Sequence, residues 1–208
     1  MLPIGGSIIM LTCHKDVLTI TKQLVNIESI VNTSGEKDIA NFIYNWIKQL
    51  PYFQENPASV VLERTVDDDR QRYNVLAYVK GTKRVSNKTV MLMGHVDTVG
   101  IDDFGQIIDA ACTPDELVQE MLTEPVPPIV EEHLISGDWI FGRGSLDMKS
   151  GLASHLYLVK YYSENPDKLE GNIVFVAECD EEDGSHGILS ALKTLRKWKK
   201  EQNFDYIA

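Results

Sequence analysis

Residues Asn172–Glu178 read NIVFVAE, a run of β-branched, aromatic and small apolar residues with its single charge at the last position. Such a run predicts a strand buried on both faces of a sheet. The acidic stretch DEED follows at residues 180–183. Four neighbouring carboxylates repel one another unless a cation lies among them, so the end of this strand is a candidate cation site. A solvated acidic turn is the alternative interpretation.

Helical and strand-like patterns alternate along the rest of the chain. Thr33 and Glu36 have capping-box spacing at the start of a helix that Pro51 ends. A short helix capped by Thr113 is also expected. The remaining predicted elements are helices at 16–30, 149–162 and 187–199, strands at 59–63, 73–79 and 89–93, an extended segment at 139–141 and a beginning strand at 204–208. This alternation predicts an α/β fold, with a mostly parallel sheet sandwiched by helices.

The chain divides into three parts by composition. Residues 1–15 begin with MLPIGGSIIML, which lacks a basic region, so we expect a flexible N-terminal extension, with Met10 as an alternative start, rather than a signal peptide. Residues 16–208 are expected to form one domain. Within it, residues 102–136 are rich in proline and are interpreted as an insertion.

Charge and hydrophobicity exclude several classes of protein. The formal net charge of −11, from 31 acidic and 20 basic residues, disfavours binding to phosphate backbones and hence to nucleic acid. No apolar run of about 18 residues is present, so no membrane span is expected. Cys13, Cys112 and Cys179 are few and far apart, a pattern typical of a reducing cytoplasm without disulfides.

Two further strings place metal-ligating side chains after apolar, strand-like residues. In GHVD, residues 94–97, His95 and Asp97 are two apart and point to the same side in extended chain. His95 is therefore a candidate metal ligand, with Asp97 orienting its ring. A strand-end histidine capped by a local aspartate is the alternative.

In GRGSLDMKSG, residues 142–151, glycines permit tight turns around Asp147. This carboxylate could offer one oxygen to each of two metal ions, or could simply cap a helix. Lys149 and Arg143 are expected to brace the acidic site or to be solvated. The other histidines are expected at the surface or in packing roles: His14, His133, His155 and His186.

Glu181 and Glu182 complete the set of candidate residues. One would bind metal, while the other would act as general base, taking a proton from water and giving it to the leaving amine. The spacing alone leaves open which glutamate has which role.

The order GHVDTVG, GRGSLDMKSG and ECDEEDGSHG resembles the co-catalytic zinc peptidase and deacylase family. This family contains acetylornithine deacetylase, succinyl-diaminopimelate desuccinylase, aminoacylase and glutamate carboxypeptidase. The resemblance extends from about Asp16 to the end of the chain. The long insertion and the sequence VNTSGEKDIANFIYNWIKQLPYF resemble the arginine-utilisation branch most closely.

The resemblance implies a role for each candidate residue. His95 matches a ligand of one zinc ion, Asp97 its catalytic neighbour, and Asp147 the aspartate that bridges two zinc ions. Glu181 matches the general base, and Glu182 a ligand of the other zinc. The implied activity is metal-dependent hydrolysis of amide bonds in a short peptide or an N-acyl amino acid, in amino-acid or arginine catabolism.

The chain departs from the family pattern after Phe204. The family has a further carboxylate ligand about one strand after the glutamate pair, a distant histidine ligand, and a smaller lid or dimerisation domain. We therefore expect an N-terminal portion without the lid, inactive by itself, of a protein that dimerises through that domain. An aminopeptidase-type di-zinc enzyme and a non-catalytic fragment that keeps the fold are the alternatives. Zinc fits the ligand types best, and cobalt or manganese also accept mixed histidine and carboxylate ligands.

Overall fold

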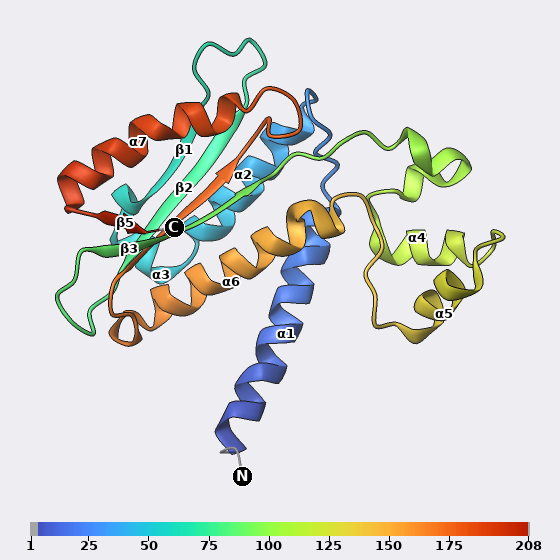
Figure 1. The fold of residues 1–208 in the computed structure, drawn as a ribbon, viewed down its shortest axis with the longest axis horizontal. Helices are drawn as coiled ribbons and strands as arrows, with labels where there is room; N and C mark the ends of the chain where they lie inside the picture. The colour runs from blue at the N-terminus through green and yellow to red at the C-terminus, as the bar shows by residue number, and fades with distance from the viewer. Residues whose placement is uncertain (1–3, 208) are drawn as a thin grey trace.

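A five-stranded sheet forms the centre of the computed structural model, which describes residues 4–207 (Figure 1). The strand order is β1-β2-β4-β3-β5. The strands are β1 (Val60–Arg64), β2 (Tyr73–Lys80), β3 (Lys88–His95), β4 (Asn172–Glu178) and β5 (Asp205–Ile207). All five predicted strands therefore form, and the NIVFVAE run is β4 itself.

The pairing within the sheet is mixed, which corrects the expected mostly parallel arrangement in one respect. Strand β4 pairs in parallel with β3, and β3 in parallel with β5. Strand β2 pairs antiparallel with both of its neighbours, β1 and β4. Four strands thus share one direction, and β2 is reversed because a loop connects it directly to β1 without a crossover helix.

Helices cover both faces of the sheet (Figure 1). On one face, α2 and α6 pack on the strands and α1 packs against α6, whereas α7 lies on the opposite face. The helices are α1 (Ile4–Val25), α2 (Gly35–Lys48), α3 (Pro51–Glu55), η1 (Pro57–Ser59), η2 (Asp102–Ala110), α4 (Pro114–Met121), α5 (Pro128–Ser136), η3 (Ser145–Lys149), α6 (Ser150–Glu164), η4 (Pro166–Lys168) and α7 (His186–Gln202). The expected α/β sandwich is confirmed.

The hydrophobic core follows the two faces of the central strands. On β4, Phe175 faces the larger core beneath α2 and α6, while Val174 and Val176 face the smaller core beneath α7. All seven residues of β4 are buried. A strand covered on both sides explains why its sequence is apolar at nearly every position rather than alternating.

The first helix differs from the expectation for the N-terminus. Helix α1 begins at Ile4, whereas the sequence analysis expected a flexible extension up to residue 15 and a helix from residue 16. Gly5 and Gly6 suggested a break, but each glycine costs a helix only about 1 kcal/mol relative to alanine. The first three residues of the expected extension lie outside the described part of the chain.

Residues 102–136 form a separate lobe beside the sheet (Figure 1). The lobe contains η2, α4 and α5, and α4 starts after Thr113 as predicted. Residues 139–141 after it form no strand. Within residues 4–207, no helix has the length and hydrophobicity that a membrane span requires.

Candidate metal centre

The candidate residues meet at the carboxyl ends of β3 and β4. His95, the last residue of β3, is the register partner of Glu178, the last residue of β4. The ladder continues for one more bond, in which the amide of Val96 donates to the Glu178 carbonyl at 2.7 Å. Chain segments leaving both strands therefore emerge side by side, where ligands bind in open α/β sheets.

The ring of His95 has a fixed orientation. It is 6% exposed, and its Nδ1 lies 3.0 Å from the backbone oxygen of Asp97. A carbonyl oxygen can only accept, so Nδ1 carries the proton in this contact. In the neutral ring, Nε2 then presents a lone pair toward Asp147, whose Oδ1 is 3.0 Å away.

Two acceptors that face each other at 3.0 Å require a positive charge between them or on the ring. Burial disfavours the charged ring, but the hydrogen bond to Asp147 and the charge of Asp97 raise the pKa of His95 above its ordinary value. The same contact is available to a metal ion, because a neutral imidazole nitrogen and a carboxylate oxygen are a common ligand pair for zinc.

Asp97 is fully buried, and its carboxylate bonds to the acidic loop rather than to the ring of His95. Its Oδ2 accepts the backbone N–H of Glu182 at 2.9 Å. Its Oδ1 lies 3.8 Å from His95 Nδ1 and has no hydrogen-bond partner among the described residues. The carboxylate was expected to hold the ring, but the backbone oxygen of the same residue makes the direct contact.

Asp147 is presented by an irregular loop between Phe141 and α6. Gly144 has a φ of 76°, and a Cβ there would lie 2.6 Å from Thr98 Cγ2. The side chain of Asp147 is 77% exposed and reaches His95 from the solvent side. The residue lies inside η3 with a non-helical φ of −116°, so it does not act as a simple helix cap.

The acidic stretch after β4 splits into two pairs with different surroundings. Asp180 is fully buried and hydrogen-bonds to Arg72 and to His186, whose Nδ1 is 2.5 Å from Oδ2. Asp183 accepts from the side-chain amide of Asn32 at 2.9 Å. The outer two carboxylates therefore already have protein partners. Arg72 is the cation that pairs with Asp180, and the argument from self-repulsion did not anticipate it.

The inner two carboxylates turn toward His95. One oxygen of Glu181 is 3.9 Å from His95 Nε2. One ligand atom each from His95, Asp147 and Glu182 lie within 4.8 Å of one another. Ligand atoms around one zinc ion are about 3.5 Å apart, so this spacing is compatible with Asp147 sharing a metal ion with His95 and another with Glu182. Burial and the neighbouring carboxylates raise the pKa of Glu182.

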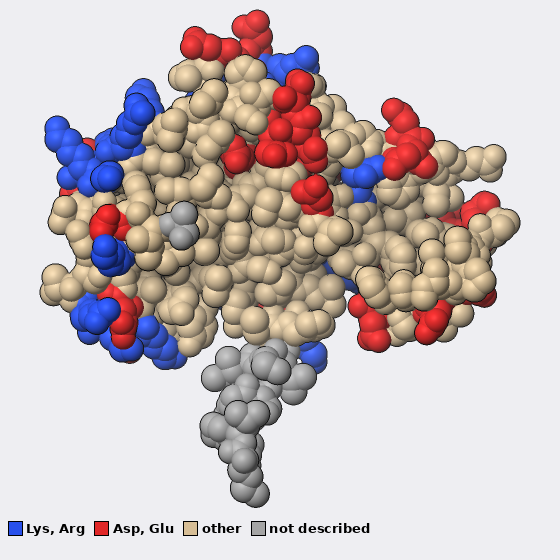
Figure 2. Space-filling model, viewed as in Figure 1, with Lys and Arg blue, Asp and Glu red and all other residues tan. Residues whose placement is uncertain are grey.

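Acidic side chains gather around this end of the molecule. Figure 2 shows them over the loop after β4, whereas lysine and arginine gather at the opposite end, near the end of α7 and the loop before β3. A hollow of about 240 Å³ adjoins the triad. Asp147, Glu182, Leu146 and Val99 are among its lining residues.

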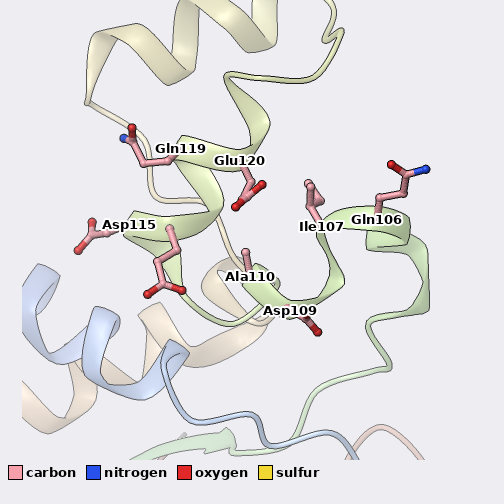
Figure 3. A pocket seen from close by; sticks show the side chains of 8 residues that line it. Gln106, Ile107, Asp109, Ala110, Asp115, Gln119 and Glu120 are labelled. Carbon is pink, nitrogen blue, oxygen red and sulfur yellow. The ribbon is translucent and has the colours of Figure 1, made fainter.

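A larger hollow of about 440 Å³ lies in the lobe of residues 102–136. In Figure 3, Glu120 of α4 and Ile107 of η2 face each other across it, with Ala110 and Asp109 below. Its lining contains carboxylates and amides but no histidine or cysteine. It is therefore a weaker metal candidate than the triad.

The two basic residues expected to brace the site do so indirectly or not at all. Lys149 is fully buried and donates to the carbonyl of Ile27 at 2.7 Å, and burial lowers its pKa to about 8. It ties the Asp147 loop to the segment after α1. Arg143 pairs with Asp103 and lies over the Phe104 ring, so it holds the lobe instead.

Sequence reasoning missed the buried residues that support the acidic loop. Glu36 was predicted to form a capping box with Thr33, but its carboxylate instead accepts the backbone N–H of Asn32 at 2.8 Å and that of Asp180 at 2.9 Å. Arg72 was not singled out, because it lies 108 positions from Asp180 and nothing local indicates that contact. Of the scattered histidines, His133 stacks on Trp139 and His186 bonds Asp180.

Comparison with known proteins agrees with this geometry. Residues 91–208 match the model of a family described as peptidase family M20/M25/M40. Protein RocB of Bacillus subtilis is 40% identical over 92% of this chain and 34% of its own length. Succinyl-diaminopimelate desuccinylase of Blochmanniella floridana is 26% identical over 86% of the chain and 39% of its own length. The chain thus spans about a third of the curated relatives it matches.

Two solved structures share the fold. Human carnosine dipeptidase 1 superposes with a TM-score of 0.60 at 20% identity, over 97% of this chain and 39% of that chain. An M20 family metallo-carboxypeptidase of Sulfolobus solfataricus gives 0.54 at 18% identity, over 90% of this chain and 35% of that chain.

Proposed function

This chain belongs to peptidase family M20/M25/M40, and from that membership we propose that the whole protein is a metal-dependent hydrolase of amide bonds. One observation carries the proposal. His95 commits Nδ1 to a backbone oxygen and points the lone pair of Nε2 at a carboxylate oxygen 3.0 Å away. In the neutral ring this contact places two lone pairs against each other, and a metal ion between them, or a proton on Nε2, removes the repulsion.

The proposed ligands are His95, Asp147 and Glu182. A donor set of one imidazole and two carboxylates fits zinc, and also cobalt or manganese. Asp147 is exposed enough to bridge two zinc ions with its two oxygens. His95 would then belong to one ion and Glu182 to the other. A metal ion held by these residues would supply a Lewis acid for the scissile carbonyl and would lower the pKa of water.

Glu181 is proposed as the general base. Its side chain is 48% exposed and one of its oxygens lies 3.9 Å from His95 Nε2, so it can reach both solvent and the reacting centre. The carboxylate would take a proton from the attacking water and transfer it to the leaving amine nitrogen. Asp97 would hold the loop that carries both glutamates through the N–H of Glu182.

The proposed substrate is a small amino-acid derivative or a short peptide. The hollow beside Asp147 and Glu182 is about 240 Å³, somewhat below the usual range for ligand pockets. Leu146 on its lining is 87% exposed and would contact an apolar part of the substrate. The resemblance to the arginine-utilisation branch, with 40% identity to Protein RocB, supports a role in arginine or amino-acid catabolism.

The test compares the whole protein with its Glu181→Gln variant. Amine release from a panel of dipeptides and N-acyl amino acids is measured with added zinc, and zinc binding is measured in parallel. We expect hydrolysis to fall by about a hundredfold or more, as for loss of a general base, while zinc still binds. Unchanged hydrolysis by Glu181→Gln, or hydrolysis that persists after chelation, would contradict the proposal.

A further inference from the structure

A buried arginine joins three loops behind the acidic stretch. Arg72 donates from Nε to Asp68 at 2.9 Å and from Nη2 to the other oxygen of Asp68 at 3.0 Å. On its other side, Nη1 contacts Asp180 and also Asn32 Oδ1, at 3.3 Å. The side chains of Arg72, Asp68 and Asp180 are at most 5% exposed. A planar guanidinium is suited to hold several acceptors in fixed directions.

Glu36 closes the network from helix α2. Its two oxygens accept from the backbone amides of Asn32, at 2.8 Å, and Asp180, at 2.9 Å. The carboxylate is fully buried and lies 3.8 Å from Arg72 Nη1. The loops at residues 32–36, 65–72 and 180–186 are thereby connected through one cation.

The same three loops contain an unusual backbone. Six non-glycine residues among those described have positive φ, and all but Asn203 lie in these loops: Asn32, Asp67, Gln71, Asp180 and Ser185. Each such residue costs about 1 kcal/mol or more and persists only where its surroundings hold it there. The hydrogen bonds around Arg72 connect these same loops and are a candidate for the interactions that hold these backbone conformations.

The consequence is a loop fastened on both sides of the glutamate pair. Asp180 is held by Arg72 and Glu36, and Asp183 by Asn32. Glu181 and Glu182 lie between these two fixed points and face His95. We propose that Arg72 is a positioning residue, which sets the geometry of Glu181 and Glu182 through Asp180 and Asn32. This inference rests on the proposed metal role of Glu182.

The alternative is that Arg72 only stabilises the fold. A buried arginine that balances buried carboxylates is costly to remove in either case, since it leaves their charges uncompensated. The two accounts differ in where the effect appears. Positioning predicts a change confined to the acidic loop and its metal affinity, whereas a general structural role predicts loosening throughout the sheet.

The experiment uses Arg72→Met, Arg72→Lys and Asp68→Asn, with Arg84→Met as the matched control. Asp68 holds Arg72 from the side away from His95, and Arg84 pairs with Glu170 at the surface. The first readout is amide hydrogen exchange in the metal-free chain at Glu182 in the acidic loop and at Val176 inside β4. The second readout is the zinc dissociation constant. Should Arg72→Met fail to fold, Asp68→Asn and Arg72→Lys make the same comparison.

We expect exchange at Glu182 to quicken about tenfold in Arg72→Met and Asp68→Asn, with Val176 unchanged. Zinc binding should weaken by about tenfold to a hundredfold, as for other residues that orient metal ligands. Arg72→Lys should give a smaller effect, since it keeps the charge and loses the fork. Equal changes at Val176, or none at Glu182, would overturn the inference. A wild type that binds no zinc would instead overturn the metal role, and exchange alone would then decide whether Arg72 tethers the loop.

Discussion

His95 and Asp97 are joined through the backbone: Nδ1 of the ring lies 3.0 Å from the Asp97 carbonyl oxygen. The Asp97 carboxylate is left to accept the amide of Glu182 at 2.9 Å. One residue therefore orients the histidine with its main chain and the acidic loop with its side chain. The orientation of the His95 ring and the position of the acidic loop therefore depend on different groups of Asp97, its carbonyl and its carboxylate.

Substitutions at Asp97 should reveal that separation. Asp97→Asn retains an oxygen acceptor for Glu182, whereas Asp97→Ala retains none and leaves a partly buried amide without its partner, at a cost of about 1 kcal/mol. We expect amide exchange at Glu182 to quicken in Asp97→Ala and to stay near the wild-type rate in Asp97→Asn. Equal exchange rates in the two variants would show that the carboxylate does not hold the loop.

Gly144 should tolerate no side chain. Alanine there would adopt a φ of 76° and place its Cβ 2.6 Å from Thr98 Cγ2, so we expect Gly144→Ala to lower the free energy of unfolding by about 2–3 kcal/mol. Gly137→Ala is the control, since its φ of 70° and ψ of 7° are left-handed like those of Gly144, with no atom within 4 Å of the added Cβ. It should cost only about 1 kcal/mol. Urea unfolding measures the loss of stability in both variants. Equal losses would show that Thr98 does not approach Gly144 closely.

Glu36 should make the stability of the metal-free chain depend on pH. Burial raises its pKa from 4.5 to about 7, against the hydrogen bonds from Asn32 and Asp180. Between those pH values the folded chain holds a proton that the unfolded chain has lost. The Glu36 contribution to stability is therefore present below pH 4.5 and is lost as the pH rises through 7.

The Glu36→Gln variant tests that dependence, because glutamine does not titrate. Urea unfolding at several pH values, with chelator present, should show a wild-type free energy of unfolding that falls between pH 4.5 and 7, with a Glu36 share of up to about 3 kcal/mol. The slope should be smaller in Glu36→Gln. Parallel pH profiles for the two chains would mean that Glu36 titrates normally in the folded state.

The elements of the fold were largely predictable because their signals are local. The apolar run of β4 and the 3–4 spacing in α2 depend on neighbouring residues, and both elements lie where they were predicted. The reversal of β2 was not predictable in this way, since strand direction depends on pairing with β4, almost a hundred residues later. The start of α1 was not predicted, because Gly5 and Gly6 indicate a break that the helix in fact accommodates.

The candidate site was likewise predictable where the signal is local and not where it depends on distant contacts. His95 and Glu182 lie together as expected from their positions after strands, and Asp147 joins them from the loop before α6, although no strand precedes it. Glu181 and Glu182 face His95 as predicted, but the reason was not visible in the sequence: Asp180 and Asp183 are turned away by partners distant in sequence, Arg72 and Asn32. A run of four acids looks uniform in the sequence, and only tertiary contacts divide it.

The most direct test of the metal centre is zinc stoichiometry by equilibrium dialysis, comparing wild type with Asp147→Ala. Asp183→Asn is the matched control, since Asp183 belongs to the same acidic stretch but bonds to Asn32 instead of facing His95. We predict saturable zinc binding by the wild type and by Asp183→Asn, and its loss in Asp147→Ala. A folded wild-type chain that binds no zinc, or binding that Asp147→Ala leaves unchanged, would contradict the account.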